Sequence, residues 1–415
     1  MTRSRPLARR STAPVRERRN RSAAPRQQQQ VALLIETSNA YARGLLEGVT
    51  AYLREHRSWA IYISEHGRGD SVPHWLEGWT GDGILARIEN RQIARAVAER
   101  KLPTVDLSAA RLLPNVPWAE TDDAAIARQA FEHLLDRGFR NLGFCGLTEY
   151  KWSTWRRESF CKLAAEAGCE CSVYEVGPIG DRAADWSADQ AHLARWLEKL
   201  PKPVGVFACF DIRGRHVLDA CRAAGLRVPD DVAVVGVDND PVLSELADPP
   251  LSSIAPDTHR TGYVAAGLLD RLMAGEPVPP EPHLIGPLGV VARRSTDALA
   301  IEDPDVSTAV RFIREHACDG ISIAQVLDAV PLSRRALETR FRKLLGRTPH
   351  EEIVRVQVQR ARELLTQTDL PLKAIADRVG IPHAEYLNVV FKRVTGQPPG
   401  VYRSENRRRT IGRPA

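Results

Sequence analysis

The chain of 415 residues contains no run of about 18 apolar residues, so its sequence predicts no membrane-spanning helix. The basic N-terminus is not followed by an apolar stretch, which argues against a secretory signal. No phosphate-binding loop, metal-ligand cluster or Ser-His-Asp pattern is present, so the sequence predicts neither a cofactor nor a metal. The seven cysteines show no zinc-ligand spacing, and without a secretory signal they fit reduced thiols in a cytoplasm.

Positive charge is concentrated at the two ends of the chain. Residues 1–30 contain nine arginines and one glutamate, and residues 305–415 contain 20 basic and 12 acidic side chains. The segment between them has 29 basic and 39 acidic side chains. Basic ends suit a polyanion, whereas the acidic middle does not. We expect 1–30 to be a disordered basic tail, because it has almost no large apolar side chain, and 406–415 to be a second basic tail.

Residues 31–298 alternate short apolar strands with helical periods. Clear strands are expected at Val31–Ile35, Gly83–Ala86, Thr104–Leu107, Leu142–Cys145, Val204–Ala208 and Val232–Val237. This alternation indicates mostly parallel sheets covered by helices, and the length allows two such α/β lobes. Ligands of open parallel sheets bind beyond the carboxyl ends of the strands, so residues that directly follow a strand are the candidate binding residues. The proline-rich stretch 277–287 is interpreted as a turn region.

The last hundred residues repeat themselves. Four positions recur fifty residues later: Leu337, Phe341, Gly346 and Pro349 return as Leu387, Phe391, Gly396 and Pro399. Each unit joins an apolar helix through a tight turn to a second helix with a polar face, which is typical of a helix-turn-helix. A helix at Glu351–Leu365 connects the units, so the two second helices can reach successive major grooves about 34 Å apart. This all-α domain is expected at 308–405, after a linker at 299–307.

The polar faces of the two second helices supply candidate DNA contacts. In the first unit Ser333 is the expected N-cap, and Leu337, Phe341 and Leu344 point inward. The outward residues are Arg334, Arg335, Glu338, Thr339 and Arg342. In the second unit Tyr386, Phe391 and Val394 are expected to be buried. The outward residues are His383, Glu385, Asn388 and Lys392.

These motifs resemble the AraC/XylS family of transcription regulators. The resemblance rests on the repeat above, on Ile375-Ala376-x-x-Val379-Gly380, and on Pro399-x-x-Tyr402-Arg403. It implies base contacts from Arg335, Glu338, Thr339, His383, Glu385, Asn388 and Val389. Family members often carry arginine where Val389 stands, and valine reaches only a thymine methyl. The resemblance also implies an operator in double-stranded DNA, RNA polymerase and a second copy of the chain as partners.

The middle segment resembles the ligand-binding domain of LacI-type repressors and sugar-binding periplasmic proteins. Its marks are Ser38-Asn39-Ala40-Tyr41, Arg156-x-x-x-Phe160, Phe210-Asp211 and Val235-Gly236-Val237-Asp238-Asn239. The resemblance implies a periplasmic-binding-protein-like sensor with its ligand between two lobes. The candidate ligand-binding residues are Asn39, Tyr41, Asp106, Arg156, Phe210, Asp211 and Asp238. Carboxylates, arginine and an aromatic face together suit a polyol.

Two of these side chains and two neighbouring tryptophans have other interpretations. Asp211 is equally well explained as the cap of a helix that begins near Ile212. Asp106, at the end of its own strand, is the weaker of the acidic candidates. Trp152 and Trp155 have two interpretations, the edge of the cleft and packing between helices, of which packing is preferred.

A LacI-type sensor joined to an AraC-type DNA-binding domain is similar to regulators of pentose catabolism. The similarity implies D-xylose as effector and activation of sugar-catabolism genes. Another sugar or a purine-like metabolite fits the same architecture, because a fold does not fix its ligand. An enzymatic alternative rests on Cys145, placed after a strand like the nucleophile of amidotransferase-like domains. No histidine follows it before His192, and we expect no enzyme.

Overall fold

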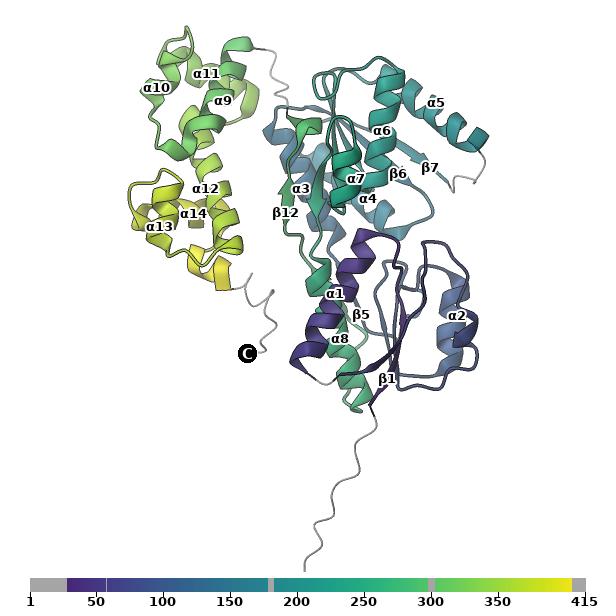
Figure 1. Cartoon of the computed structure of the whole chain (residues 1–415). Coiled ribbons are helices and arrows are strands. Elements are labelled where there is room, and N and C mark those ends of the chain that lie inside the picture. Colours follow the sequence, from purple (N-terminus) through teal and green to yellow (C-terminus); the bar gives the residue numbers. More distant parts are fainter. Residues whose placement is uncertain (1–27, 57, 178–182, 298–302, 405–415) are drawn as a thin grey trace, which may run out of the picture.

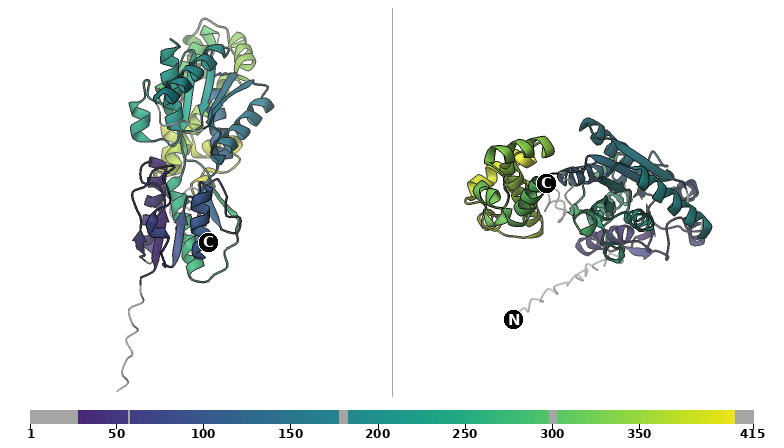
Figure 2. Two further views of the ribbon diagram at one scale, coloured as in Figure 1. Left: turned by 90° about the vertical axis from the view of Figure 1, so that its right-hand side faces the viewer. Right: turned by 90° about the horizontal axis from the view of Figure 1, so that it is seen from above.

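The computed structural model describes residues 28–56, 58–177, 183–297 and 303–404. Two α/β lobes are stacked end to end, and an all-helical domain lies beside the second lobe (Figure 1). The view from above shows this domain on one side of the sensor (Figure 2). The predicted two-lobed sensor and helical domain are therefore confirmed. Most of the N-terminal tail (1–27), the C-terminal tail and residues 298–302 lie outside the described residues.

The first lobe is a six-stranded parallel sheet in the order β11-β5-β4-β3-β1-β2. Alternate residues of β1 point to opposite faces: Val31 and Leu33 pack under α1 and α8, whereas Ala32 and Leu34 pack under α2. Both faces are buried, which explains the continuous apolar strands. The elements are β1 (Gln30–Leu34), β2 (Ala60–Tyr62), β3 (Gly83–Ala86), β4 (Thr104–Asp106), β5 (Trp118–Thr121), β11 (Pro282–Ile285), α1 (Ala40–Glu55), α2 (Arg91–Arg100) and α8 (Thr258–Met273).

The second lobe repeats this plan with the strand order β12-β10-β9-β8-β6-β7, in which only β12 is antiparallel to its neighbour. Phe144, Phe207 and Val235 bury one face of the sheet, and Cys145, Val206 and Val234 bury the other. The elements are β6 (Asn141–Leu147), β7 (Cys171–Val176), β8 (Val204–Ala208), β9 (Val232–Val237), β10 (Ser252–Ala255), β12 (Gly289–Val291), α3 (Asp123–Asp136), α4 (Lys151–Glu166), α5 (Ala183–Lys199), α6 (Asp211–Ala223) and α7 (Pro241–Leu246).

The chain crosses between the lobes three times, from β5 to α3, from β10 to α8, and from β11 to β12. The first crossing is short, because Thr121 ends β5 and Asp122 already caps α3 by accepting a hydrogen bond from the backbone N–H of Ala125 at 3.0 Å. Three adjacent crossings form a hinge about which the lobes can open and close.

One prediction for this region is wrong. The proline-rich stretch is not only a turn, because β11 begins at Pro282 and pairs in parallel with β5. β11 is the edge strand of its sheet, where a proline at the first position removes no ladder hydrogen bond. The sequence patterns also gave no strand at Trp118–Thr121 or Ser252–Ala255.

The helical domain contains two units that share one long helix. The first is α9 (Pro304–His316), α10 (Ile323–Asp328) and α11 (Arg334–Leu345); the second is α13 (Leu372–Arg378) and α14 (Ala384–Thr395), with α12 (Pro349–Gln367) between them. Asp303 caps α9, so this helix begins inside the stretch that was assigned to the linker. Within the described ranges, no helix combines the length and apolar character that a bilayer crossing requires.

The repeat predicted from the sequence is present in space. Ser333 caps α11 as expected, and Gly346 and Gly396 end α11 and α14 with φ angles of 69° and 81°. On α14, however, Tyr386 and Val394 are 42% and 48% exposed, so their predicted burial is wrong. The buried face comprises Leu387, Val390 and Phe391, so of the three predicted residues only Phe391 is buried.

The two units are fixed to each other through α12. Gln357 is buried and donates from Nε2 to the carbonyls of Ala317 at 2.9 Å and Gly380 at 3.2 Å. Gly380 has a φ of 70°, and a Cβ there would lie 2.7 Å from the carbonyl oxygen of Cys318. Because α12 has 19 residues, it is about 28 Å long and holds the units apart as a rigid spacer.

Candidate effector cleft and DNA-reading surface

The carboxyl ends of the two sheets face each other across the hinge, and two adjoining cavities lie between them. The inner one measures about 20 Å³ and the outer one about 550 Å³, and both are lined by Arg68, Phe210 and Asp238. The other residues of the inner cavity lie at or beyond the carboxyl ends of strands, as the rule that binding residues follow strands predicts. They are Tyr41, Arg87, Glu120, Thr121, Trp152 and Arg156.

Arg156 lies on α4 and is 4% exposed. Its Nε donates to the carboxylate of Asp123 at 2.7 Å, and Nη1 donates to the carbonyl of Cys209 at 2.6 Å. Burial opposes the charge of Arg156, but Asp123 outweighs it and the pKa of Arg156 is raised. Burial also raises the pKa of Asp123, to about 6, although Arg156 partly offsets this. The guanidinium is thus oriented at the cleft wall before any ligand arrives.

Glu120, the last residue but one of β5, is an incompletely satisfied acidic group of the cleft. It is buried, and none of the described residues offers a hydrogen-bond donor to its Oε2. Burial raises its pKa well above the usual value, and the nearby Asp123 raises it further. A buried carboxylate oxygen without a partner is costly, and a ligand hydroxyl would satisfy it.

Tyr41 contributes a phenol that is held from two sides. Its hydroxyl lies 3.2 Å from Oγ1 of Thr121, and the guanidinium of Arg87 lies over its ring, 5.1 Å from the centroid. Arg87 is fixed by ion pairs with Glu36 at 2.7 Å and Glu89 at 2.5 Å. This wall of the cleft is therefore rigid and belongs wholly to the first lobe.

Arg68 reaches from the first lobe onto aromatic rings of the second. Its guanidinium carbon lies 5.3 to 5.6 Å from the ring centroids of Phe210, Trp152 and Tyr150. Trp152 and Phe210 meet edge to face at 5.7 Å. Aromatic faces of this kind cover the C–H side of a sugar, so Arg68 occupies the place where a sugar ring would stack.

Asp238 follows β9 in a strained backbone. Its φ is 107° and that of Asn239 is 48°, values that side-chain-bearing residues rarely adopt. The strain is held by hydrogen bonds from the Asp238 N–H to the Ile254 carbonyl at 3.1 Å and from the Asn239 N–H to Oγ of Ser253 at 3.0 Å. Such strain is typical of functional sites, and here it directs Asp238 into both cavities.

Asp211 lines the outer cavity, but its carboxylate is already engaged. Oδ1 accepts from Ser253 at 2.6 Å and Oδ2 accepts from the backbone N–H of Asp240 at 2.9 Å. Its alternative role as helix cap is wrong, because the N-cap of α6 is Phe210 and Asp211 is the first helical residue. Asp211 locks the loop after β9 and thereby positions Asp238.

Asn39 and Asp106 also have structural partners. Asn39 lines the outer cavity while its side chain caps α1, accepting from the Ala42 N–H at 2.9 Å. Asp106 lines neither cavity, and its Oδ1 accepts from the backbone N–H groups of Ile88 and Ser108. Of the seven predicted residues, Tyr41, Arg156, Phe210 and Asp238 therefore meet around the inner cavity.

Sequence reasoning missed five residues of the inner cavity. Arg87 directly follows a predicted strand, so it satisfied the rule that binding residues follow strands, but it was not among the candidate ligand-binding residues. Glu120 and Thr121 lie on a strand that was not recognised, and Arg68 lies in a long loop. For Trp152 packing between helices was preferred over the edge of the cleft, whereas the structure places it in the cavity wall.

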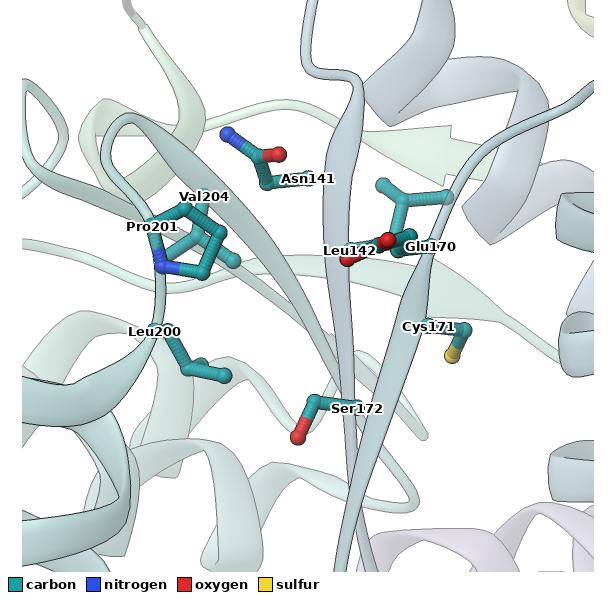
Figure 3. A pocket seen from close by; sticks show the side chains of 8 residues that line it. All are labelled: Asn141, Leu142, Glu170, Cys171, Ser172, Leu200, Pro201 and Val204. Carbon is teal, nitrogen blue, oxygen red and sulfur yellow. The ribbon is translucent and has the colours of Figure 1, made fainter.

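A third cavity of about 350 Å³ lies at the opposite edge of the second sheet (Figure 3). It is lined by the amino ends of β6 and β8 and the start of β7, including Asn141, Cys171 and Val204. No strand ends there at its carboxyl edge, so this cavity does not share the features of the cleft.

Cys145 does not support the enzymatic alternative. It is fully buried in the second lobe, and burial raises the pKa of its thiol to about 11. A nucleophilic cysteine requires an accessible thiolate, which this environment disfavours. All seven cysteines lie in the described ranges, and no disulfide joins any of them.

The predicted DNA contacts are displayed on the surfaces of α11 and α14. Arg334, Arg335, Thr339 and Arg342 are exposed in the first unit, and Glu338 is partly exposed and paired with Arg334 at 3.1 Å. In the second unit all five predicted contacts are exposed, namely His383, Glu385, Asn388, Val389 and Lys392. Val389 is 61% exposed, which suits an apolar contact to a base rather than a core role.

Known families match all three parts of the chain. An XylR N-terminal domain matches residues 30–124, a periplasmic binding protein-like domain matches 131–296, and a helix-turn-helix domain matches 326–405. The xylose operon regulatory protein of Escherichia coli K12 is 37% identical over 386 residues, which cover 91% of this chain and 97% of that protein. The chain belongs to this family.

Two further comparisons agree with this membership. The xylose operon regulatory protein of Haemophilus influenzae is 33% identical over 90% of this chain and 97% of its own length. The solved structure of the xylose-binding transcription activator XylR is 35% identical, with a TM-score of 0.60 over 92% of this chain and 99% of that one. The chain is thus a DNA-binding transcription regulator, in agreement with the expectation that it is not an enzyme.

Glu120→Gln is expected to stabilise the unliganded protein by about 1–3 kcal/mol at pH 8, because it removes an unpartnered buried charge. Folding raises the pKa of Glu120 above its usual value of about 4.5. The free-energy penalty of its buried charge therefore begins above that pH and grows until the pH reaches the folded-state pKa. Thermal unfolding at pH 5 and pH 8 checks this, with exposed Glu47→Gln as the control. A variant that melts below the wild type at pH 8 would contradict it.

Proposed function

We propose that this protein is a sugar-responsive transcription activator whose effector, D-xylose, binds in the inner cleft. The observation that carries the proposal is the convergence of three arginines, two carboxylates and aromatic rings where the carboxyl ends of both sheets meet. The names of the two relatives and of the solved structure support xylose over other polyols. Asp238 and Glu120 accept from sugar hydroxyls, and Arg156 and Arg87 donate to sugar oxygens.

The inner cavity has room for about one water molecule, so a pentose enters only when the cleft rearranges. We propose that Arg68 leaves the aromatic rings and that the sugar ring takes its place against Trp152 and Phe210. The hinge then recloses on the sugar, and the closed arrangement is the one that binds DNA more tightly.

The remaining assignments follow from the same scheme. The sensor comprises 31–298, and the DNA-binding domain extends from Asp303 to residue 405 after a short linker. Arg334, Arg335, Glu338, Thr339 and Arg342 of α11 enter one major groove, and the outward residues of α14 enter the next. The protein acts in the cytoplasm as a homodimer on direct-repeat half-sites and recruits RNA polymerase.

Isothermal titration of the full chain with D-xylose tests the effector, with L-arabinose, D-ribose and D-glucose as controls. We expect binding in the micromolar-to-millimolar range for D-xylose alone. If another sugar or a purine such as guanine bound in place of D-xylose, the assignment of the effector would be wrong and the two-domain architecture would stand. Arg43 lines only the outer cavity, so we expect the Arg43→Ala variant to bind D-xylose with an affinity within about threefold of the wild type.

A further inference from the structure

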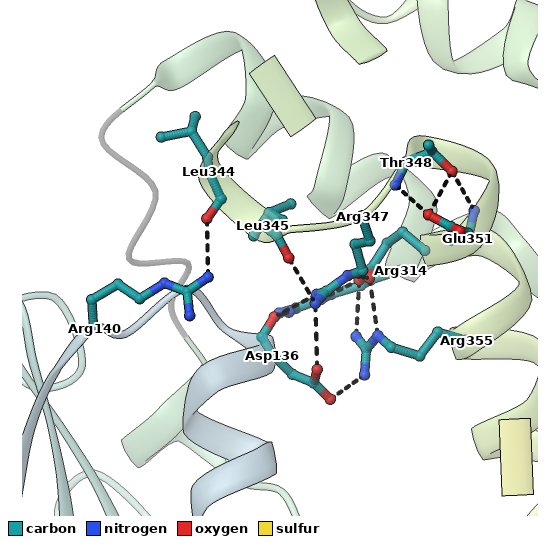
Figure 4. A network of polar contacts seen from close by, with 10 residues as sticks. Asp136, Arg140, Arg314, Leu344, Leu345, Arg347, Thr348, Glu351 and Arg355 are labelled. Atoms are coloured by element: carbon teal, nitrogen blue, oxygen red, sulfur yellow. Dashed lines mark hydrogen bonds and ion pairs between the residues drawn. The ribbon is translucent and has the colours of Figure 1, made fainter. Parts of the chain in front are cut away.

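The last residue of α3, Asp136, contacts the helical domain with its backbone and its side chain (Figure 4). Its carbonyl accepts from Arg314 at 2.7 Å and from Arg347 at 3.2 Å. Its carboxylate accepts from Arg355 and forms an ion pair with Arg347 at 3.6 Å. The last carbonyls of a helix carry partial negative charge, so this end of α3 is a natural seat for cations.

The three arginines come from α9, from the turn between α11 and α12, and from α12, and they meet around one buried acid. Glu352 of α12 is 0% exposed and accepts from Arg347 at 2.5 Å and from Arg355 at 2.9 Å. Burial would raise the pKa of Glu352, but Arg355 and Arg347 outweigh it and lower this pKa to about 2. Within the helical domain the three arginines face one carboxylate, that of Glu352. Asp136 of the sensor supplies a second carboxylate.

Side chains near the end of α3 also contact Thr296, close to where the chain leaves the sensor. Nε2 of His133 lies 2.8 Å from Oγ1 of Thr296, and Nε of Arg137 donates to the Thr296 carbonyl at 2.8 Å. Arg140, just beyond α3, donates to the carbonyl of Leu344 at the end of α11 at 3.3 Å. The helical domain is thus attached to the second lobe through Asp136 at the end of α3 and Arg140 just beyond it, as well as through the linker.

The opposite end of α3 lies at the effector cleft. Asp123 is its first residue and forms the ion pair with Arg156. The helix has 14 residues and is about 21 Å long, so one rigid element has one end at the sugar site and the other end at the DNA-binding domain.

We propose that the Asp136 end of α3 is a docking surface for the first helix-turn-helix unit, which makes the DNA-binding domain move with the second lobe when the effector binds. The inference rests on the proposed function, because it names the path by which the sugar signal reaches DNA. Asp136 is a positioning residue: it touches neither sugar nor DNA, and it sets the orientation of the unit through Arg347 and Arg355.

The test compares full-length wild type and Asp136→Ala in two measurements, D-xylose affinity by titration and duplex affinity with and without saturating D-xylose. The duplex is one selected by the wild type from a random library. We expect the variant to bind D-xylose within about twofold of the wild type. The ratio of its duplex affinities with and without sugar should fall from about 5–150 in the wild type to near one.

Asp219→Ala is the matched control, because Asp219 lies on the second lobe and pairs across one turn with Arg222 of the same helix. Asp136→Asn keeps a side-chain oxygen that can accept from Arg355 but removes the charge, so it should give an intermediate ratio and serves as the second variant if Asp136→Ala folds poorly. An unchanged ratio in Asp136→Ala, or loss of its D-xylose binding, would overturn the docking inference and leave the proposed function intact. A wild type that binds no D-xylose would contradict the proposed function itself.

Discussion

Arg156→Met is expected to weaken D-xylose binding by about 10- to 150-fold, because a hydrogen bond to a charged group contributes about 1.5–3 kcal/mol. The same change is expected to destabilise the sensor by about 3–5 kcal/mol, since it leaves the buried carboxylate of Asp123 without its cation. Titration with D-xylose and denaturant unfolding measure the two effects separately.

A double variant separates the two roles of Arg156. Asp123→Asn combined with Arg156→Met removes both charges, so it should recover most of the stability but none of the sugar affinity. In the single variant the pKa of Asp123 rises further above about 6, so its deficit in stability is larger at pH 8 than at pH 5. Full sugar affinity in either variant would show that Arg156 does not contact the effector.

Arg335→Ala is expected to weaken binding to the selected duplex by about 5- to 150-fold, because a bidentate arginine–guanine contact contributes about 1–3 kcal/mol of discrimination. Arg335 is exposed on the first turns of α11, the part of a recognition helix that reaches base edges. Fluorescence anisotropy with a labelled duplex measures the change.

The base preference of this variant distinguishes base recognition from phosphate contact. Loss of a base contact relaxes the preference at one position, whereas loss of a phosphate contact weakens binding to all sequences alike. Exposed Arg91→Ala on α2, in the first lobe, removes the same charge far from the helical domain and should bind like the wild type. Unchanged affinity in Arg335→Ala would remove this residue from the recognition surface.

The parts of the fold that the sequence predicted are those with strong local patterns. The apolar runs of β8 and β9 and the fifty-residue repeat are visible without any tertiary information. β5 and β11 were missed because Trp118–Thr121 is partly polar and Pro282–Ile285 follows several prolines. Their strand character depends on pairing with partners distant in sequence, a contribution that local propensity does not contain.

The residues of the candidate cleft, like the strands of the fold, were predicted only in part. The resemblance to LacI-type sensors, together with the rule that binding residues follow strands, selected Tyr41, Phe210 and Asp238, and all three line the inner cavity. The rule did not show that the carboxylate of Asp211 is occupied by Ser253, nor that Glu120 is left without a donor. Hydrogen-bond satisfaction depends on long-range contacts, and so does the meeting of Asp136 with Arg355 across domains.

The central claim is that sugar binding between the lobes controls DNA binding by the helical domain. The most direct measurement is the affinity of the full chain for its selected duplex, by fluorescence anisotropy, with no sugar, with saturating D-xylose and with the same concentration of L-arabinose. The account predicts that D-xylose increases the affinity by about 5- to 150-fold and that L-arabinose leaves it unchanged. Equal affinity in all three conditions would contradict it.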